Sequence, residues 1–326
     1  MELLKIEFIQ LLKGKKNLLA FSGGVDSSAL FFLLKSHSID FDIAIVDYEV
    51  RNESKTEVGF AKELATKYQL MVHTTTAPRF QSHFEESARA FRYNFFHQLI
   101  EKYGYENLLT AHQLDDKLEW FFMRFIRGAG VVELSGMEEI SFFSNPPHHL
   151  IRPLLGVSKD ELLTYLDTHQ LPYFIDKSNF DEKYERNHFR KHFSTPLIQK
   201  YKEGIARTFR YIQEDKKMLL SGFEELFHQE DLYIIELFEG ANVAQIADIY
   251  LKKLGYLLSF KQRHELKHLS SIVIGRKFAI ERSDNKLFIA PFISVKLPKE
   301  FKEKCRIAKI PPKVRGYLFE KHINLS

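Results

Sequence analysis

The chain has almost no cysteine. Cys305 is the single cysteine among 326 residues, so no disulfide can form within the chain and no cysteine-based metal cluster can assemble from it. Tryptophan is equally scarce, with one residue, Trp120. Chemistry that relies on several thiolates is therefore excluded for this chain on its own.

Long hydrophobic runs are also missing. No apolar stretch approaches the roughly 20 residues that a membrane-spanning helix needs. The first 14 residues alternate charged and apolar side chains and lack the apolar core and small-residue cleavage site of a signal peptide. With 44% hydrophobic and 28% charged residues, the composition predicts a folded protein with no membrane contact, of about two domains, in the cytoplasm.

The charge is small overall but uneven. The net charge is +4, yet residues 296–326 carry nine Lys or Arg against three Glu. A tail of +6 indicates a polyanionic partner, although a solvated basic face explains it equally well.

Short apolar runs alternate with helical patterns over residues 17–126. The runs predict strands and the segments between them predict helices, in this chain order: strand Asn17–Phe21, helix Asp26–Lys35, strand Phe41–Val46, helix Ser54–Tyr68, strand Leu70–Thr75, helix Phe84–Tyr103, strand Asn107–Thr110, helix Asp115–Ile126. Such alternation predicts an α/β fold with a parallel sheet flanked by helices. In these sheets, ligands bind outside the carboxyl ends of the strands.

The pattern changes after Arg127. A helix is predicted over Ser158–His169, with Ser158 and Glu161 as a capping box. Residues 172–196 are expected to be irregular, and a helical pattern returns over 197–227. The remainder predicts a smaller α+β domain with these elements: strand Leu232–Leu237, helices Asn242–Leu254 and Phe260–Leu269, and a hairpin of Ser271–Glu281 with Lys286–Ile293. The expected division is 1–200 catalytic, 201–228 linking helix and 229–326 C-terminal domain.

A glycine-rich turn follows the first strand. Gly23 and Gly24 allow a tight turn that brings backbone N–H groups against an oxyanion, and the following helix directs its positive end to the same place. The expected ATP contacts are Ser22, Gly23, Gly24, Val25, Asp26, Ser27 and Ser28. Asp26 does not favour a phosphate, so we expect it to bind Mg²⁺ or to orient a group. The turn lacks the Gly-Lys-Ser/Thr of a Walker A motif.

The run Ser22-Gly23-Gly24-Val25-Asp26-Ser27 resembles the PP-loop of ATP pyrophosphatases. The resemblance implies an adenine nucleotide alpha hydrolase-like fold, in which the loop holds pyrophosphate while ATP is cut between its α and β phosphates.

The segment after the fourth strand resembles one PP-loop family. His112-Gln113-Leu114-Asp115-Asp116-Lys117-Leu118-Glu119 is followed by Arg127-Gly128-Ala129-Gly130 and Leu134-Ser135-Gly136-Met137. Together they are similar to the His-x-x-Asp-Asp-x-x-Glu, Arg-Gly-x-Gly and Leu-x-Gly-Met signature of tRNA(Ile)-lysidine synthases. Further matches to this family are Glu86–Tyr93, Arg152–Leu155, Asp176–Asn179 and Arg186–Arg190.

Two positions depart from that family pattern. Residues 47–50 replace a His-rich segment, so no role is assigned to them. Trp120 stands where the family usually has threonine.

The resemblance implies a reaction and its participants. ATP would adenylate C2 of the wobble cytidine in the CAU anticodon of tRNA(Ile), and free L-lysine would then displace AMP. Arg92 or Arg190 would hold the α-phosphate, and His112, Asp115 or Asp116 would act as base. Glu119 and Asp176 would form the acidic lysine pocket.

Residues for RNA contact are expected in two places. Residues 184–192 interleave aromatic and basic side chains, as unstacked bases require. The expected tRNA contacts are Arg186, Asn187, Arg190, Lys302, Lys304 and Lys309. The family also suggests a homodimer.

Three alternatives remain. A tRNA-thiolating enzyme would need cysteines near the motifs. A synthetase acting on a small molecule would leave the basic tail unexplained. An inactive RNA-binding protein would have no use for Asp26, His112, Asp115 and Asp116.

Overall fold

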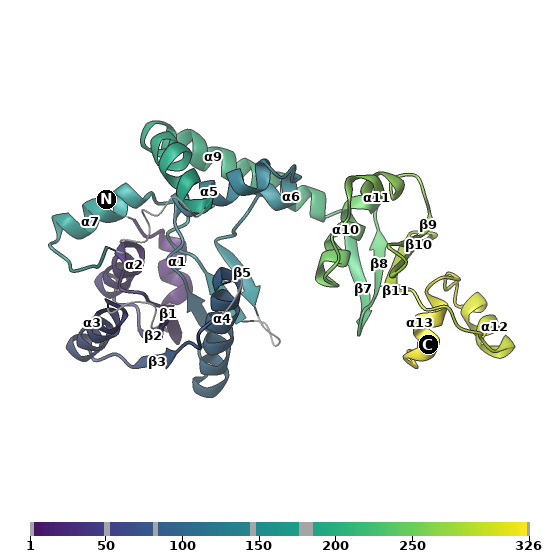
Figure 1. The fold of residues 1–326 in the computed structure, drawn as a ribbon, viewed down its shortest axis with the longest axis horizontal. Coiled ribbons are helices and arrows are strands. Elements are labelled where there is room, and N and C mark those ends of the chain that lie inside the picture. The colour runs from purple at the N-terminus through teal and green to yellow at the C-terminus, as the bar shows by residue number, and fades with distance from the viewer. Residues whose placement is uncertain (1–2, 49–52, 81–83, 144–147, 176–184, 325–326) are drawn as a thin grey trace. The chain divides into compact units, whose positions relative to one another are not determined.

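The structure is a computed structural model that describes residues 3–48, 53–80, 84–143, 148–175 and 185–324. The chain divides into two compact units, residues 1–212 and 213–326. Figure 1 labels most of the helices and strands of both units. The division falls inside one helix, α9 (Thr195–Leu220).

Unit 1 is built on a six-stranded sheet in the order β3-β2-β1-β4-β6-β5. Its strands are β1 (Asn17–Ala20), β2 (Phe41–Asp47), β3 (Val72–Thr76), β4 (Asn107–Leu109), β5 (Ile140–Phe143) and β6 (His148–Ile151). All pairings are parallel except that of β5 with β6. The helices of this unit are α1 (Ile6–Leu12), α2 (Val25–Ser36), α3 (Glu53–Tyr68), α4 (Phe84–Tyr103), α5 (Leu114–Phe125), α6 (Val131–Leu134), α7 (Lys159–Thr168) and α8 (Glu185–Phe189).

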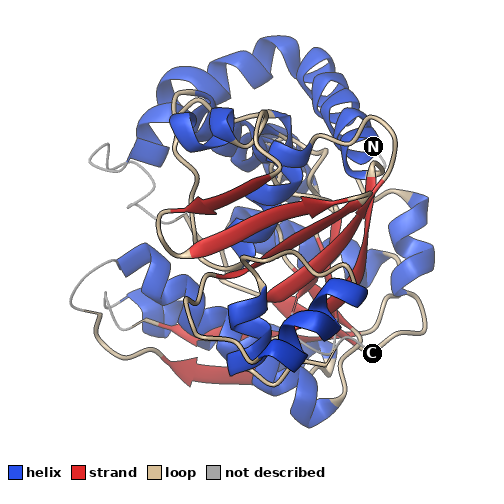
Figure 2. Ribbon diagram, turned by 90° about the vertical axis from the view of Figure 1, so that its right-hand side faces the viewer, coloured by secondary structure: helices blue, strands red, loops and turns tan. Residues whose placement is uncertain are grey.

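The central strands β1, β2 and β4 are largely buried on both faces, as expected of a parallel sheet between helices. Leu19, Ile43 and Leu109 face a core shared with α1, α2, α3 and α7. Their neighbours Leu18 and Leu108 face a second core, which α4 supplies with Phe96, Leu99 and Ile100. Consecutive residues point to opposite faces because the strand period is two. The predicted α/β fold is therefore confirmed, and Figure 2 shows its strands in red and its helices in blue.

One antiparallel hairpin was not predicted. Ile140 in β5 pairs with Ile151 in β6, and Phe143 pairs with His148. The signal lay in two four-residue runs on either side of Ser144-Asn145-Pro146-Pro147, a typical turn composition. Residues 144–147 lie outside the described residues.

The expected irregular segment 172–196 is partly helical. The described portion contains α8, a π-helical turn over Arg190–Ser194 and the start of α9. Helix α9 ends at Leu220, so the helix expected to reach Phe227 is too long. Residues Phe223–Gln229 form strand β7 instead.

Unit 2 contains a five-stranded antiparallel sheet in the order β7-β8-β11-β10-β9. The strands after β7 are β8 (Leu232–Leu237), β9 (Ser271–Ile274), β10 (Phe278–Ser283) and β11 (Lys286–Pro291). The segment predicted as one strand, 271–281, is thus two strands joined by a tight turn. Helix α10 (Val243–Lys253) follows the prediction closely, whereas α11 (Phe260–Glu265) begins as predicted but ends before the expected Leu269.

Both faces of this second sheet are covered. Tyr233 and Ile235 of β8 face a core shared with α10, whereas Leu232 and Ile234 face a core shared with the tail. The tail forms α12 (Lys299–Ile307) and α13 (Arg315–Glu320), which sequence analysis did not predict as helices. Of its apolar residues, Ile310, Val314 and Leu318 are buried, but Ile307 is 72% exposed. The basic tail is therefore an integral part of unit 2. Within the described residues no helix is both long and apolar enough to span a bilayer.

Candidate active site

The candidate site lies at the carboxyl ends of neighbouring strands. β1 pairs with both β2 and β4 in parallel, so the segments that follow β1 and β4 emerge at the same edge of the sheet. The first is the Ser22-Gly23-Gly24 turn and the second is Thr110–Gln113. This is the edge where ligands bind in open α/β sheets.

The turn after β1 requires glycine at one position. Gly23 has φ +76°, and a Cβ there would lie 3.3 Å from the ring of Phe174. The Gly23 carbonyl accepts from Phe174 N–H at 2.8 Å. Gly24 caps α2 without a side chain, which leaves the first N–H groups of the helix available to an anion.

The serines shape this turn. Ser22 is exposed, and its Oγ lies 3.1 Å from Ser27 Oγ. Ser28 donates from Oγ to the Gly23 carbonyl at 3.1 Å and is fully buried. Ser28 was expected to contact phosphate, and the structure corrects this: its hydroxyl supports the turn from beneath. Val25 is buried too, so it offers only its backbone N–H.

Asp26, in the first turn of α2, carries an unsatisfied carboxylate. Its Oδ1 is buried and has no hydrogen-bond partner among the described residues. Burial raises the pKa of Asp26 to about 7, and the charge of Asp116 adds to this, while Lys159 and Arg190 oppose it. A buried acid among other acids suits a bound cation.

The donor set fits Mg²⁺ if ATP supplies further oxygens. Mg²⁺ usually binds through one or two carboxylates together with water and phosphate oxygens. The described residues contain no group of three or more His, Cys, Asp or Glu side chains that could hold a metal alone. Asp26 therefore remains the metal-binding candidate.

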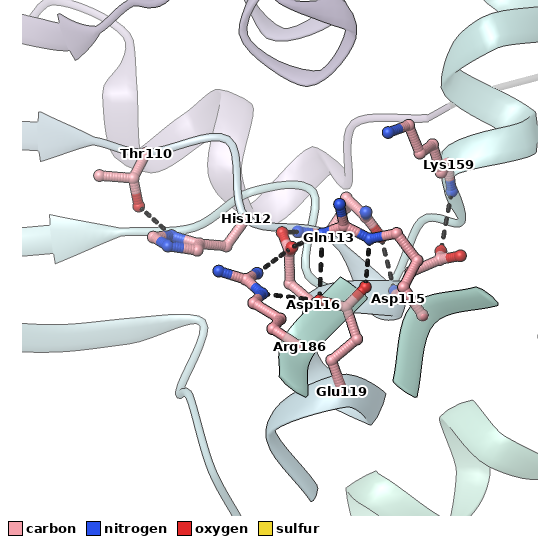
Figure 3. Close-up of polar contacts among 9 residues, drawn as sticks. Thr110, His112, Gln113, Asp115, Asp116, Glu119, Lys159 and Arg186 are labelled. Carbon is pink, nitrogen blue, oxygen red and sulfur yellow. Dashed lines mark hydrogen bonds and ion pairs between the residues drawn. The ribbon is translucent and has the colours of Figure 1, made fainter. Parts of the chain in front are cut away.

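Helix α5 begins with two buried carboxylates. Gln113 caps the helix by accepting from Asp115 N–H, and Asp116 Oδ2 accepts from Gln113 N–H at 3.1 Å. Asp115 Oδ2 accepts from Lys159 N–H, at the start of α7, at 3.0 Å. The predicted capping box of α7, Ser158 with Glu161, is also present. Figure 3 shows the contacts of Gln113, Asp115 and Asp116 at the start of α5.

The two carboxylates differ in acidity. Burial, together with the charges of Asp116 and Glu119, raises the pKa of Asp115 to about 6, although the hydrogen bond from Lys159 N–H opposes this. Burial would raise the pKa of Asp116 as well, but the charge of Arg186, with His112 and Arg190, holds it below its usual value. Asp116 is therefore a permanent anion, whereas Asp115 titrates near neutral pH.

His112 is neutral at physiological pH. Its Nδ1 hydrogen bonds with Thr110 Oγ1 at 2.9 Å. Burial lowers the pKa of His112 to about 4; Asp116 opposes this, and Arg152, Arg186 and Arg92 add to it. A neutral imidazole beside several arginines can accept a proton once a polyanion neutralises their charge.

Glu119 binds two arginines. Its side chain is fully buried, Oε2 accepts from Arg186 Nε at 2.7 Å, and Oε1 accepts from Arg190 Nε at 2.6 Å. Arg186 also pairs with Asp116. Sequence analysis singled out Glu119 for lysine binding, but here both of its oxygens are already occupied by arginine. In this arrangement it positions Arg186 and Arg190 at the site.

Comparison with known proteins agrees with the motifs. The PP-loop domain model matches residues 3–197. The chain is 43% identical over 324 residues to the tRNA(Ile)-lysidine synthase of Campylobacter jejuni, covering 99% of this chain and 98% of the relative. The Wolinella succinogenes enzyme of the same name is 41% identical over 98% of this chain and 97% of the relative. The chain belongs to the tRNA(Ile)-lysidine synthase family.

A solved structure supports the fold alone. The U34-tRNA thiolase NcsA of Methanococcus maripaludis aligns with a TM-score of 0.54 at 17% identity, covering 65% of this chain and 76% of that one. Membership of the lysidine synthase family and of the PP-loop domain family implies that the site uses ATP.

Arg92, from α4, belongs to the same charge cluster. Its charge acts on His112 and on Tyr48, whose pKa burial raises. Tyr48 follows β2 and donates to the Ala88 carbonyl at 3.3 Å. Sequence analysis assigned Tyr48 no role because the family pattern is absent there. Arg152 was noted only as part of a motif, yet it is buried and donates to the Glu138 carbonyl at 2.7 Å.

The remaining predicted residues lie elsewhere. Asp176 lies outside the described residues. Asn187 is on α8, between Arg186 and Arg190 in sequence. Lys302, Lys304 and Lys309 are exposed residues of unit 2. The structure thus brings together the following predicted residues: Asp26, His112, Asp115, Asp116, Glu119, Arg186 and Arg190. Arg92 belongs with them because its charge lowers the pKa of His112.

Proposed function

We propose that this chain joins free L-lysine to C2 of the wobble cytidine in the CAU anticodon of tRNA(Ile), using ATP. The observation that carries the proposal is the charge cluster at the ends of β1 and β4, in a chain 43% identical to a named lysidine synthase along nearly its whole length. The site holds both signs of charge, as a reaction between a polyanion and a cationic amino acid requires.

The first step forms the adenylated tRNA. The C2 oxygen of cytidine attacks the α-phosphorus of ATP, the bond to the β-phosphate oxygen breaks, and pyrophosphate leaves. N–H groups at the start of α2 are available to the leaving pyrophosphate. Arg190, placed by Glu119, and Arg92 are the cations for the α-phosphate.

Asp26 is the residue proposed to hold Mg²⁺. When bound, the ion would stabilise negative charge on the phosphate oxygens. Asp26 Oδ1 supports this assignment, since it is buried without a hydrogen-bond partner among the described residues, and the charges of Lys159 and Arg190 only partly offset the raised pKa of the carboxyl.

The second step forms the new C–N bond. The lysine ε-amine attacks C2, AMP leaves with the former C2 oxygen, and the amine loses a proton. His112 is the proposed base, because it is neutral and lies in the field of Asp116. Asp115 is the alternative, since its pKa of about 6 also permits proton transfer near neutral pH.

The lysine pocket is assigned to Asp176, with Glu119 as a second acid only if substrate binding releases one of its arginines. Arg186, Asn187 and Arg190 are proposed to contact the anticodon, and Lys302, Lys304 and Lys309 the phosphates farther along the tRNA. We assign catalysis to unit 1 and RNA binding to unit 2. The helix expected to link them over 201–228 ends at Leu220, and Phe223–Gln229 already belongs to the sheet of unit 2. A homodimer acting in the cytoplasm completes the proposal.

One assay tests the proposal. Purified protein is incubated with ATP, Mg²⁺, tRNA(Ile) and labelled lysine, and AMP and lysine-labelled tRNA are quantified. AMP release should require tRNA, and incorporation should favour lysine over arginine and ornithine. Incorporation of all three at equal rates would contradict the lysine pocket, and AMP release without tRNA would point to a small-molecule synthetase. Thiolation is disfavoured, because Cys305 is buried within unit 2.

A further inference from the structure

Three residues of α5 form a stripe that starts in the candidate site. Asp116, Trp120 and Arg124 are spaced four apart, so they lie one above another on one side of the helix. Asp116 faces Arg186 within the site. The stripe therefore leads from the reacting groups along α5.

Trp120 is held in place but stays open to solvent. Gly136 has φ +64°, and a Cβ there would lie 3.0 Å from Trp120 Cδ1, so the indole packs against backbone that only glycine leaves accessible. The Arg124 Cζ lies 4.4 Å from the centre of the indole ring. Even so, Trp120 is 37% exposed. Because the ring is already fixed and also exposed, a partner can bind to it with little loss of side-chain entropy.

The chemistry of the pair favours RNA. Unstacked bases bind aromatic rings and arginine planes, and a guanidinium also donates to phosphate. An apolar partner would gain nothing from the charge of Arg124, which it would have to desolvate.

We propose that Trp120 and Arg124 bind a nucleotide that flanks the modified cytidine. Its base stacks on the indole and guanidinium, and its phosphate accepts from Arg124 N–H groups. This inference rests on the proposed function, in which tRNA is the substrate.

The intrinsic fluorescence of the unlabelled protein monitors this site, because Trp120 is its single tryptophan. An RNA stem–loop carrying the CAU anticodon should quench tryptophan emission of the full-length protein as it binds. A fully paired RNA duplex of equal length should leave the emission unchanged. Arg124→Gln should weaken binding and reduce the quenching at a given RNA concentration.

Affinity is measured separately, from the anisotropy of end-labelled stem–loop. Trp120→Thr, which installs the family residue, should bind roughly tenfold more weakly, whereas Trp120→Phe should stay close to wild type because it keeps a stacking ring. Phe125→Thr is the matched control: Phe125 is 60% exposed on the same helix but off the stripe. It should bind as wild type. Thermal unfolding of each variant checks that the fold is kept.

The proposal is overturned if saturating stem–loop leaves tryptophan emission unchanged, or if Trp120→Thr and Arg124→Gln both bind as tightly as wild type. These readouts need no turnover. If the stem–loop quenches tryptophan emission but no lysine is incorporated, the proposed function is overturned and the nucleotide site at Trp120 and Arg124 is retained. If lysine is incorporated but Trp120→Thr and Arg124→Gln both bind RNA with wild-type affinity, the nucleotide site is overturned and the proposed function is retained.

Discussion

The carboxylates of Asp26 and Asp116 are close enough for their charges to interact: the negative charge of Asp116 adds to burial in raising the pKa of Asp26 to about 7. Asp26 lies in the first turn of α2 and Asp116 in the first turn of α5, 90 residues apart in sequence. Asp116 is neutralised by Arg186, whereas Asp26 Oδ1 has no described partner. Asp26 is thus the carboxylate that has most to gain from a bound cation.

This relationship predicts how stability depends on pH. Because the pKa of Asp26 is raised from 3.8 to about 7 in the folded state, the folded protein keeps a proton between these values that the unfolded chain has released. The contribution of Asp26 to stability therefore falls as pH rises through this window. Asp26→Asn, measured by thermal unfolding without nucleotide or Mg²⁺, should raise Tm more at pH 8 than at pH 4.

The control is Glu63→Gln, an exposed acid on α3. It should shift Tm equally little at both pH values. An Asp26→Asn shift that is the same at pH 4 and pH 8 would contradict the assignment of a raised pKa.

The same residue should be essential for turnover. With Mg²⁺ as the only divalent metal, Asp26→Ala should lower AMP formation by at least about a hundredfold. Removing a single group that stabilises charge in a transition state typically has an effect of this size. The substitution removes no core packing, so circular dichroism should match wild type. Full AMP formation by the variant would refute the role of Asp26.

Glu119 offers a test between two roles. It is fully buried and binds Arg186 and Arg190. Removing one partner of a buried ion pair costs about 3–5 kcal/mol. Glu119→Gln should therefore be strongly destabilising, although by less than this amount because the glutamine side chain still accepts hydrogen bonds. Glu185→Gln breaks the exposed pair with Arg127 and should cost less than about 1 kcal/mol.

Steady-state kinetics of Glu119→Gln then separate the roles. If Glu119 positions the arginines, kcat should fall and KM for tRNA should rise, while KM for lysine stays near wild type. A selective rise in KM for lysine would instead place Glu119 in the amino acid pocket.

The succession of strands and helices from β1 to α5 was predictable because each element carries its own local signal, whereas α1 was not predicted. Apolar runs bounded by turn residues marked β1 and β4, and Ser158 with Glu161 marked α7. The site residues were predictable as residue types, but their pairing was not. Glu119 and Arg190 are 71 positions apart, and nothing local in the sequence indicates that they form an ion pair.

Strand β7 shows why one prediction was wrong. Phe223 and Phe227 are four residues apart, which is a helical spacing. In the structure the pairing with β8 shifts between Glu225 and Phe227, a β-bulge. The extra residue sends Phe223 to one face of the sheet and Phe227 to the other. The two phenylalanines are thus apolar because each faces a different core of the two-sided sheet, and not because they share one face of a helix.

Two glycines should respond oppositely to one substitution. Gly204, in α9, has nothing within 4 Å of an added Cβ, so Gly204→Ala should stabilise by about 0.5–1 kcal/mol. At Gly316, in α13, a Cβ would lie 1.9 Å from the Ile293 carbonyl oxygen. Gly316→Ala should therefore displace α13 and lower Tm sharply. Chemical denaturation of both variants checks this, and equal effects would contradict the packing of α13.

The last prediction concerns the basic tail. Truncation near residue 295 cannot test it cleanly, because Val314, Tyr317 and Leu318 are buried in the core of unit 2. Lys302 and Lys304 are exposed on α12. Lys302→Glu with Lys304→Glu changes charge at the surface and leaves this core intact.

If these lysines bind tRNA phosphates, the double variant should bind tRNA more weakly at low salt. The slope of log K against log salt should fall by about 0.7–0.9 for each phosphate that the variant no longer neutralises. Lys309→Glu is tested separately, because Lys309 pairs with Asp284 at 2.9 Å, an exposed pair that is worth less than about 1 kcal/mol. ATP binding should persist in every variant, because the loop that carries it lies in unit 1. If the double variant binds tRNA with wild-type affinity and the same salt dependence, RNA binding is assigned to Arg186, Arg190 and their neighbours in unit 1.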